Sequence, residues 1–208
     1  MRRLLYLGLR PPELPGYEVI HYPVIRIEPL PCPELVEAWP RATHLVVTSP
    51  TGAELFAARG LPMADRLLIA LGEGTRLACE EQQLRVDVTA EVPTSEGVVA
   101  LLETLEWSPQ ALCIITRSSR SRDAIRPALE RLGIATLAPL LYVTHLQEPR
   151  PAYNLARIDA IAFTSPSTIA GFLAIYGAVP KGIELLIQGP ITQQALSEIG
   201  VEPKMGQV

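Results

Sequence analysis

Serine and proline stand side by side at two places where a buried strand would run into a helix. Ser49-Pro50 follows the apolar residues 45–47, and Ser165-Pro166 follows the apolar residues 160–163. Serine is a favoured N-cap and proline suits the first helical position, so each pair predicts a helix that begins at its proline. The free N–H groups and the dipole at such a helix start attract carboxylates and phosphates. The pattern therefore points to an anionic ligand.

Glycine marks two more helix starts of this kind. Gly189-Pro190 repeats the pattern and Gly72-Glu73-Gly74 is close to it, each after an apolar run. Thr75 and Thr192 then fall in the first helical turn, where their hydroxyls would lie near free backbone N–H groups. Capping chemistry explains each of these residues taken singly, so a purely structural role stays open beside ligand binding.

One turn of the chain is densely cationic, and one tyrosine follows it in an apolar strand. Arg117, Arg120 and Arg122 are interspersed with serines directly after the strand predicted over residues 112–116. Guanidinium groups bind carboxylates through charge-assisted hydrogen bonds, although a solvated loop would show the same pattern. Tyr142 has apolar neighbours, as most core tyrosines do, so packing and catalysis both stay open for it.

The composition excludes several classes of protein. The 208 residues are 48% apolar and 19% charged with a formal net charge of −4, which favours a folded α/β protein over a disordered or nucleic-acid-binding one. The longest apolar runs have strand length and fall far short of the roughly 20 residues that span a bilayer. Residues 4–9 are too short for a secretion signal. We therefore expect a cytoplasmic protein with no membrane or nucleic-acid partner.

Cofactor and metal sites lack their usual sequence signatures. The turn at Gly72 has no third glycine of the dinucleotide fingerprint, and the chain has no phosphate-binding P-loop motif and no G-x-S-x-G elbow. The three histidines show no ligand spacing, and the three cysteines are too widely spaced for a zinc motif or a disulfide framework. We expect neither a cofactor nor a metal.

The chain repeats itself at an offset of 116 or 117 residues. The matching pairs are Ser49 and Ser165, Pro23 and Pro139, and Thr75 and Thr192. A nearly constant offset at three places indicates two copies of one supersecondary unit.

The first copy is shorter than the second between its first two strands. The strand that ends at Arg10 matches the strand that ends at Arg117, but these arginines are only 107 residues apart. In the second copy, residues 122–133 predict a short helix with Pro127 in its first turn or at a kink. The first copy has only residues 11–16 at this place, rich in proline, so we expect a loop instead of the helix.

Strands that alternate with helices predict parallel sheets with right-handed crossovers. We expect two flavodoxin-like, doubly wound α/β domains joined by a two-stranded connector. Residues 1–24 and 146–208 would form domain 1 and residues 25–145 domain 2, so that the N-terminal strand joins the C-terminal half. Ligands bind at the carboxyl ends of the strands in such sheets, and we expect the site in the cleft between the domains.

Short segments along almost the whole chain carry a further signal when they are taken in order. They are Pro23-Val24-Ile25, Val46-Val47-Thr48-Ser49-Pro50, Ala70-Leu71-Gly72-Glu73-Gly74-Thr75, Val92-Pro93-Thr94-Ser95-Glu96-Gly97, Thr116-Arg117 with Arg122, Pro139-Leu140-Leu141-Tyr142, Ala162-Phe163-Thr164-Ser165-Pro166-Ser167 and Gln188-Gly189-Pro190-Ile191-Thr192. Together these segments resemble the uroporphyrinogen-III synthase family. The resemblance implies a cofactor-free lyase that closes hydroxymethylbilane, a linear tetrapyrrole with eight carboxylates. Ring D is inverted through a spiro intermediate and water is lost, which gives uroporphyrinogen III. Such an enzyme needs one folded substrate geometry more than a strong acid or base.

The resemblance also implies roles for individual residues. Tyr142 matches a recurrent tyrosine of the family that is proposed to assist departure of the hydroxyl. The substrate-binding residues that the resemblance implies are Ser49, Thr75, Ser95, Thr164, Ser165, Ser167, Gly189 and Thr192, with Arg10 and Arg117 as matches to strand-end arginines. Two departures stand out, because residues 11–16 replace a helix usual in the family and Ser118 replaces a common glycine.

The resemblance implies a small-molecule substrate, the linear tetrapyrrole, as the ligand. It also implies a monomer that contacts hydroxymethylbilane synthase only transiently. A non-catalytic, two-lobed binding or regulatory protein is the main alternative, motivated by the missing first helix. A flavodoxin-like pair of redox domains is a third possibility, which visible flavin absorbance would reveal.

Overall fold

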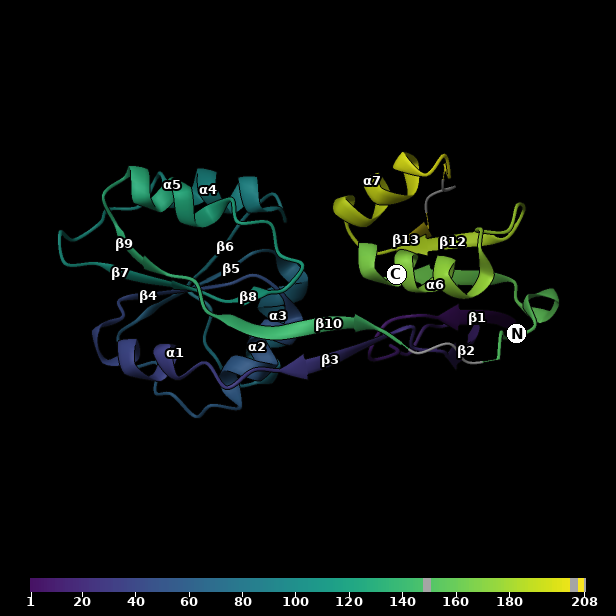
Figure 1. Ribbon diagram of the computed structural model, residues 1–208, viewed down its shortest axis with the longest axis horizontal. Coiled ribbons are helices and arrows are strands. Elements are labelled where there is room, and N and C mark those ends of the chain that lie inside the picture. The colour runs from purple at the N-terminus through teal and green to yellow at the C-terminus, as the bar shows by residue number, and fades with distance from the viewer. Residues whose placement is uncertain (148–150, 203–205, 208) are drawn as a thin grey trace. The chain divides into compact units, whose positions relative to one another are not determined.

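The computed structural model describes residues 1–147, 151–202 and 206–207 (Figure 1). The chain forms two compact units: Met1–Ile27 with Thr144–Val208 make unit 1, and Glu28–Val143 make unit 2. No helix in the described part of the chain is both long and apolar enough to cross a membrane.

Unit 1 is built on a five-stranded parallel sheet with the order β13-β12-β11-β1-β2. Its strands are β1 (Arg2–Tyr6), β2 (Tyr17–His21), β11 (Ala160–Phe163), β12 (Glu184–Ile187) and β13 (Gly206–Gln207). In chain order within the unit this is 2-1-3-4-5, the flavodoxin order. The N-terminal strand β1 pairs with β11 of the C-terminal half, which confirms the predicted exchange.

The two faces of this sheet are covered differently. Helices α6 (Pro166–Tyr176) and α7 (Pro190–Glu198) pack together, and Phe172 and Leu196 join the core of Leu5 and its neighbours on one face. On the other face, Leu4, Tyr6, Ala160, Ala162 and Leu186 are covered by Leu14, Tyr17 and Val19. No helix lies between β1 and β2, as predicted, and the short 3-10 helix η2 (Leu155–Arg157) precedes β11.

Unit 2 contains a second five-stranded parallel sheet, with the order β6-β5-β4-β7-β9. Its strands are β4 (His44–Val47), β5 (Leu67–Ala70), β6 (Val88–Thr89), β7 (Leu112–Ile115) and β9 (Ala135–Leu137). Counted from β7 rather than from β4, the order is again 2-1-3-4-5. The predicted repeat and the parallel α/β fold are thus confirmed. The first two strands of the first repeat, β1 and β2, lie in unit 1 with the later strands of the second repeat, and β7 and β9 of the second repeat lie in unit 2 with the later strands of the first.

Helices cover both faces of the unit 2 sheet (Figure 1). They are α1 (Pro33–Ala38), followed by the 3-10 helix η1 (Trp39–Arg41), then α2 (Pro50–Ala57), α3 (Glu73–Glu81), α4 (Ser95–Leu102) and α5 (Ile125–Arg131). Helices α4 and α5 pack against each other, as do α2 and α3. Pro127 lies in the first turn of α5, and the glycine after the helix, Gly133, has φ 75°, as expected for a C-terminal stop. Helix α1 was not predicted.

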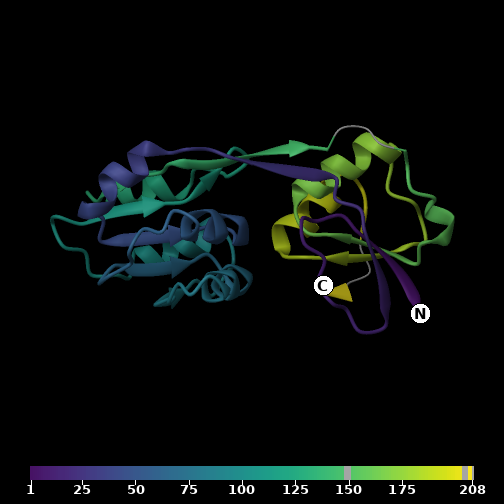
Figure 2. The same cartoon turned by 90° about the horizontal axis from the view of Figure 1, so that it is seen from below.

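A small sheet links the two units along the chain. It contains β3 (Ile25–Pro29), β10 (Leu140–Leu146) and β8 (Arg117–Ser118), in the order β3-β10-β8. The chain passes from unit 1 to unit 2 within β3 and returns within β10, which confirms the two-stranded connector. In Figure 2 these are the two long strands in dark purple and green that leave unit 2.

One strand was predicted too long. The first strand was expected to end at Arg10, but β1 ends at Tyr6 and Arg10 lies exposed in the loop that follows. The loop begins where Gly8 approaches Thr164: a Cβ on Gly8 would lie only 2.8 Å from the Thr164 hydroxyl. The proline pair after Arg10 also lacks the N–H groups that a ladder needs.

Candidate active site

Tyr142 and Ser49 meet in unit 2, although they are 93 residues apart in the chain. The Tyr142 hydroxyl lies 3.0 Å from Ser49 Oγ, and the tyrosine side chain is 7% exposed. Ser49 is the N-cap of α2, and its Oγ accepts a hydrogen bond from the Gly52 N–H at 3.0 Å. The phenol is therefore placed beside the positive end of α2.

Two threonines that were not predicted as site residues, Thr48 and Thr116, join the ends of β4 and β7. The Thr48 N–H donates to Thr116 Oγ1 at 3.1 Å, and the Thr48 hydroxyl donates to the Thr116 carbonyl at 2.6 Å. A Cβ on Gly52 would lie 3.1 Å from both Ser49 Oγ and Thr116 Oγ1. Each threonine follows an apolar strand in the sequence, which could have marked it as a strand-end residue. That the two threonines pair depends on β4 and β7 being neighbours in the sheet.

The second helix start of unit 2 presents Thr75. Gly72 is the N-cap of α3, and Thr75 is buried in the first turn at 4% exposure. Its hydroxyl has no hydrogen-bond partner within the described parts of the chain. The turn is closely packed, since a Cβ on Gly72 would lie 2.6 Å from Pro93. An unpartnered hydroxyl at a helix start can bind a carboxylate oxygen.

Ser95 lies in the first turn of α4, directly after the N-cap Thr94. The Thr94 hydroxyl oxygen accepts from the Gly97 N–H at 3.1 Å, so Thr94 carries the cap. A Cβ on Gly97 would lie 2.1 Å from the Val92 carbonyl, which explains glycine at that position.

Arg117 lies in β8, beside β10. Its N–H donates to the Pro139 carbonyl at 3.2 Å, and the Ser119 N–H donates to the Tyr142 carbonyl at 3.0 Å. The strand pair therefore ties the arginine to the tyrosine within unit 2. The Arg117 side chain is 27% exposed and forms an ion pair with Asp123 at 3.4 Å. The predicted cationic turn thus contains its own carboxylate partner.

In unit 1, the end of β11 and the start of α6 bring three predicted residues together. Ser165 is the N-cap of α6, and its Oγ accepts from the Thr168 N–H at 3.4 Å. Thr168 completes a capping box, because its Oγ1 accepts from the N–H groups of Thr164 at 3.1 Å and Ser165 at 3.2 Å. Ser167 is buried in the first turn. Thr168 was not predicted, although threonine three residues after Ser165 is a capping signal.

The end of β12 and the start of α7 form the neighbouring helix start of unit 1. Gly189 is the N-cap with φ 79°, a left-handed conformation that favours glycine. Thr192 lies in the first turn at 3% exposure, and its hydroxyl has no hydrogen-bond partner among residues 1–147 and 151–202. Because β11 and β12 are adjacent parallel strands, both helix starts lie at the same edge of the sheet.

The predicted residues therefore fall into two groups. Unit 2 carries Tyr142, Ser49, Thr75, Ser95 and Arg117, and unit 1 carries Thr164, Ser165, Ser167, Gly189, Thr192 and Arg10. Tyr142 and Ser49 are in direct contact, whereas Arg10 lies on the loop after β1 rather than at a strand end.

The three cysteines are buried and form no disulfide. Burial raises the pKa of the Cys79 and Cys113 thiols to about 12, which disfavours the reactive thiolate. No group of three His, Cys, Asp or Glu side chains in the described part of the chain is arranged to hold a metal ion.

A family model described as "Uroporphyrinogen-III synthase HemD" matches residues 13–205. The chain is also 30% identical over 151 residues to a curated protein of Methanothermobacter thermautotrophicus with a provisional uroporphyrinogen-III synthase name. This match covers 66% of the chain but 59% of that relative, so the chain spans about three fifths of its length.

Solved structures share the fold across almost the whole chain. A mutant uroporphyrinogen III synthase from the extremely thermophilic bacterium Thermus thermophilus has a TM-score of 0.63 at 23% identity, covering 98% of this chain and 91% of that one. The uroporphyrinogen-III synthetase of Helicobacter pylori 26695 has a TM-score of 0.64 at 16% identity, with the same two coverages. Since the family model extends over residues 13–205, the chain belongs to the uroporphyrinogen-III synthase family.

Proposed function

We propose that the protein closes hydroxymethylbilane to uroporphyrinogen III, with inversion of ring D and loss of water. The observation that carries this proposal is the contact of the Tyr142 hydroxyl with Ser49 at the start of α2, inside the region that the family model matches. Tyr142 would assist departure of the ring A hydroxyl: the C–O bond breaks, its electrons leave with oxygen, and a proton completes water. Ring D then attacks the resulting azafulvene through its substituted carbon.

The four helix starts support binding of a polycarboxylate. Each of α2, α3, α6 and α7 begins directly after a parallel strand, with hydroxyls of Ser49, Thr75, Ser165 or Thr192 in its cap or first turn. Free N–H groups and the helix dipole favour carboxylates at these ends. Holding several carboxylates of one flexible substrate fixes its folded geometry, which is the main requirement when closure of the bilane needs little chemical help.

The isomer of the product tests this proposal. Purified protein is mixed with freshly generated hydroxymethylbilane, the products are oxidised, and the porphyrin isomers are separated. We expect the type III isomer to predominate with the protein and the type I isomer with heat-denatured protein. Type I porphyrin alone in both samples would contradict the proposal.

One structural feature favours a second function, a non-catalytic two-lobed binding protein. The chain has a loop instead of a helix between β1 and β2, so one wall of unit 1 differs from its counterpart around α5 in unit 2. This alternative predicts tetrapyrrole binding without a change in the isomer ratio, and the same assay therefore separates the two functions.

The proposal includes several further expectations. The two compact units are proposed as the domains of the enzyme, and the placement of substrate in an interdomain cleft stays a prediction. We also propose that the protein acts as a cytoplasmic monomer and meets hydroxymethylbilane synthase only transiently. Sedimentation of the purified protein, alone and with that synthase, measures both association states.

A further inference from the structure

The turn after β8 is held in one conformation by hydrogen bonds of Ser118 and Ser121. The Ser118 N–H donates to Ser121 Oγ at 2.9 Å, the two serine hydroxyls lie 3.0 Å apart, and the Arg120 N–H donates to Ser118 Oγ at 3.3 Å. Together with the bond from Ser119 to the Tyr142 carbonyl, these contacts fix the backbone on which Arg117 stands.

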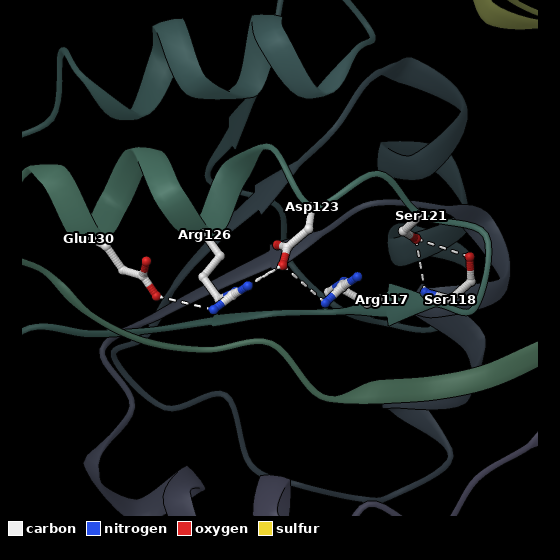
Figure 3. Close-up of polar contacts among 6 residues, drawn as sticks. All are labelled: Arg117, Ser118, Ser121, Asp123, Arg126 and Glu130. Atoms are coloured by element: carbon white, nitrogen blue, oxygen red, sulfur yellow. Dashed lines mark hydrogen bonds and ion pairs between the residues drawn. The ribbon is translucent and has the colours of Figure 1, made fainter.

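A row of four alternating charges begins at Arg117 and runs onto α5 (Figure 3). Asp123 Oδ2 lies 3.4 Å from Arg117 Nη1, 2.9 Å from Arg126 Nε and 2.5 Å from Arg126 Nη2. Arg126 Nη1 lies 3.4 Å from Glu130 Oε1. Asp123 Oδ2 therefore binds Arg126 closely and Arg117 more loosely.

Arg117 keeps unused capacity for a second anion. Its Nε is buried and has no hydrogen-bond partner among the described residues, and Asp123 is the ion-pair partner found for its guanidinium there. An arginine has five N–H donors in a planar fork that fits a carboxylate. Burial without a partner is unfavourable for such a donor, so a carboxylate that binds the fork and satisfies it gains binding free energy.

We propose that Asp123, braced by Arg126, is a positioning residue that holds Arg117 ready for a carboxylate of the substrate. This inference rests on the proposed function and deepens it, because it assigns a substrate-orienting role to a pair that otherwise resembles an ordinary surface salt bridge. Asp123 touches no substrate and acts through Arg117, whose rotamers it limits before the ligand arrives.

Two other roles of Asp123 predict a different effect of its neutralisation on substrate binding. If Asp123 competed with the substrate for Arg117, its neutralisation would tighten binding, because a negative charge would leave the site. If Asp123 served only the fold, its neutralisation would lower thermal stability and leave substrate binding unchanged. A positioning role predicts weaker binding despite the extra positive charge.

The first experiment compares wild type with Asp123→Asn and Asp123→Glu. We expect Asp123→Asn to raise KM for hydroxymethylbilane about fivefold with kcat within about twofold of wild type, the size of effect seen when one charge-assisted contact is loosened. Asp123→Glu keeps the charge and should recover part of the loss. An unchanged or lowered KM in Asp123→Asn would overturn the proposal.

A double-mutant cycle tests whether the effect passes through Arg117. In an Arg117→Gln background, Asp123→Asn should change KM by less than about twofold, because the residue that it positions is gone. An equal effect in both backgrounds would show that Asp123 acts independently of Arg117 and would overturn the proposal.

Asp87→Asn is a matched control elsewhere in unit 2, beside the start of β5. The Asp87 side chain is 28% exposed against 26% for Asp123, and it pairs with Arg85 and accepts from the Leu68 N–H at the start of β5. This substitution should lower the melting temperature and leave KM unchanged.

A binding measurement keeps the inference separate from the proposed function. Uroporphyrin III, the oxidised form of the proposed product, carries the same eight carboxylates and can be titrated by its fluorescence. We expect Asp123→Asn to weaken its Kd about fivefold, and the difference to vanish in the Arg117→Gln background. If turnover fails but this pattern holds, only the proposed function is lost; equal Kd values for wild type and Asp123→Asn overturn the inference.

Discussion

At the residue scale, the central feature is a phenol whose partner also caps a helix. Ser49 Oγ accepts from the Gly52 N–H and lies 3.0 Å from the Tyr142 hydroxyl, so the serine fixes both the start of α2 and the position of the tyrosine oxygen. In the proposed function, the phenol would exchange its contact with Ser49 Oγ, which already accepts from a backbone N–H, for a contact with the leaving hydroxyl. That exchange is what a general acid requires.

Replacing Tyr142 by phenylalanine should lower kcat about a hundredfold, the lower range for loss of a general acid. The free energy of unfolding should fall by only about 1 kcal/mol, because one hydrogen bond is lost and the ring stays. Turnover and thermal melting of the variant measure the two effects.

Tyr22→Phe is the matched control for this change. Tyr22 is also 7% exposed, and its hydroxyl donates to the Pro151 carbonyl at 2.9 Å in unit 1. The Tyr22→Phe variant should lose about as much unfolding free energy as Tyr142→Phe, and its kcat should be unchanged. A stable Tyr142→Phe protein with full turnover would show that Tyr142 is a packing residue.

Thr192 offers a substitution that separates binding from folding. Its hydroxyl has no partner within the described residues, so Thr192→Val removes no hydrogen bond found in the folded chain. We expect stability to be retained and KM to rise about fivefold, equivalent to roughly 1 kcal/mol for one hydrogen bond to substrate. An unchanged KM would remove Thr192 from the binding site.

Asp123 should make the protein sensitive to acid. The hydrogen bond with Arg126 lowers the pKa of the Asp123 carboxyl below its usual value, with Arg117 adding to the effect. A lowered folded-state pKa stabilises the fold above the unfolded pKa of about 3.9, and this stabilisation is lost as the pH falls through the folded value. Denaturant unfolding at several pH values should show a steeper loss of stability below about pH 4 in wild type than in Asp123→Asn. Parallel curves for the two proteins would contradict this assignment.

At the element scale, α6 is fitted to the start of the connector by one glycine. A Cβ on Gly171 would lie 2.6 Å from the Val24 carbonyl, which also accepts from the Gln147 N–H at 2.8 Å. The helix, the residue before β3 and the residue after β10 are thus packed together in unit 1. This contact explains a glycine in the middle of an apolar helix.

Gly171→Ala tests this packing, because helix propensity and close packing predict opposite changes in the free energy of unfolding. Intrinsic helix propensity alone predicts that alanine stabilises the helix by about 1 kcal/mol. The close contact with Val24 predicts the opposite, a loss of roughly 1–3 kcal/mol from overpacking. A fall in the urea midpoint supports the close packing of α6 on Val24, whereas a rise would contradict it.

The elements were predictable where local chemistry decides them. Ser49-Pro50, Ser165-Pro166 and Gly189-Pro190 begin helices as expected, because capping and proline geometry act within one turn. The end of β1 was misplaced, since an apolar run alone does not show where a neighbouring strand stops pairing. The contact between Tyr142 and Ser49 could not be read from spacing, because it depends on which strands become neighbours.

At the scale of the whole molecule, the repeat explains both units. Strands β1 and β2 complete the sheet of β11, β12 and β13, while β7 and β9 complete the sheet of β4, β5 and β6. The offset of about 116 residues revealed this arrangement, because matching prolines marked the strands that connect the units. The same repeat places an anion-attracting helix start after two strands of each sheet.

The most direct test of the account is a single-turnover reaction with the protein in excess over hydroxymethylbilane. Product isomers are measured as the protein concentration rises. We predict that the type III fraction climbs to nearly all of the product and falls back toward type I when Tyr142→Phe replaces wild type. A product that stays type I at every protein concentration would contradict the account.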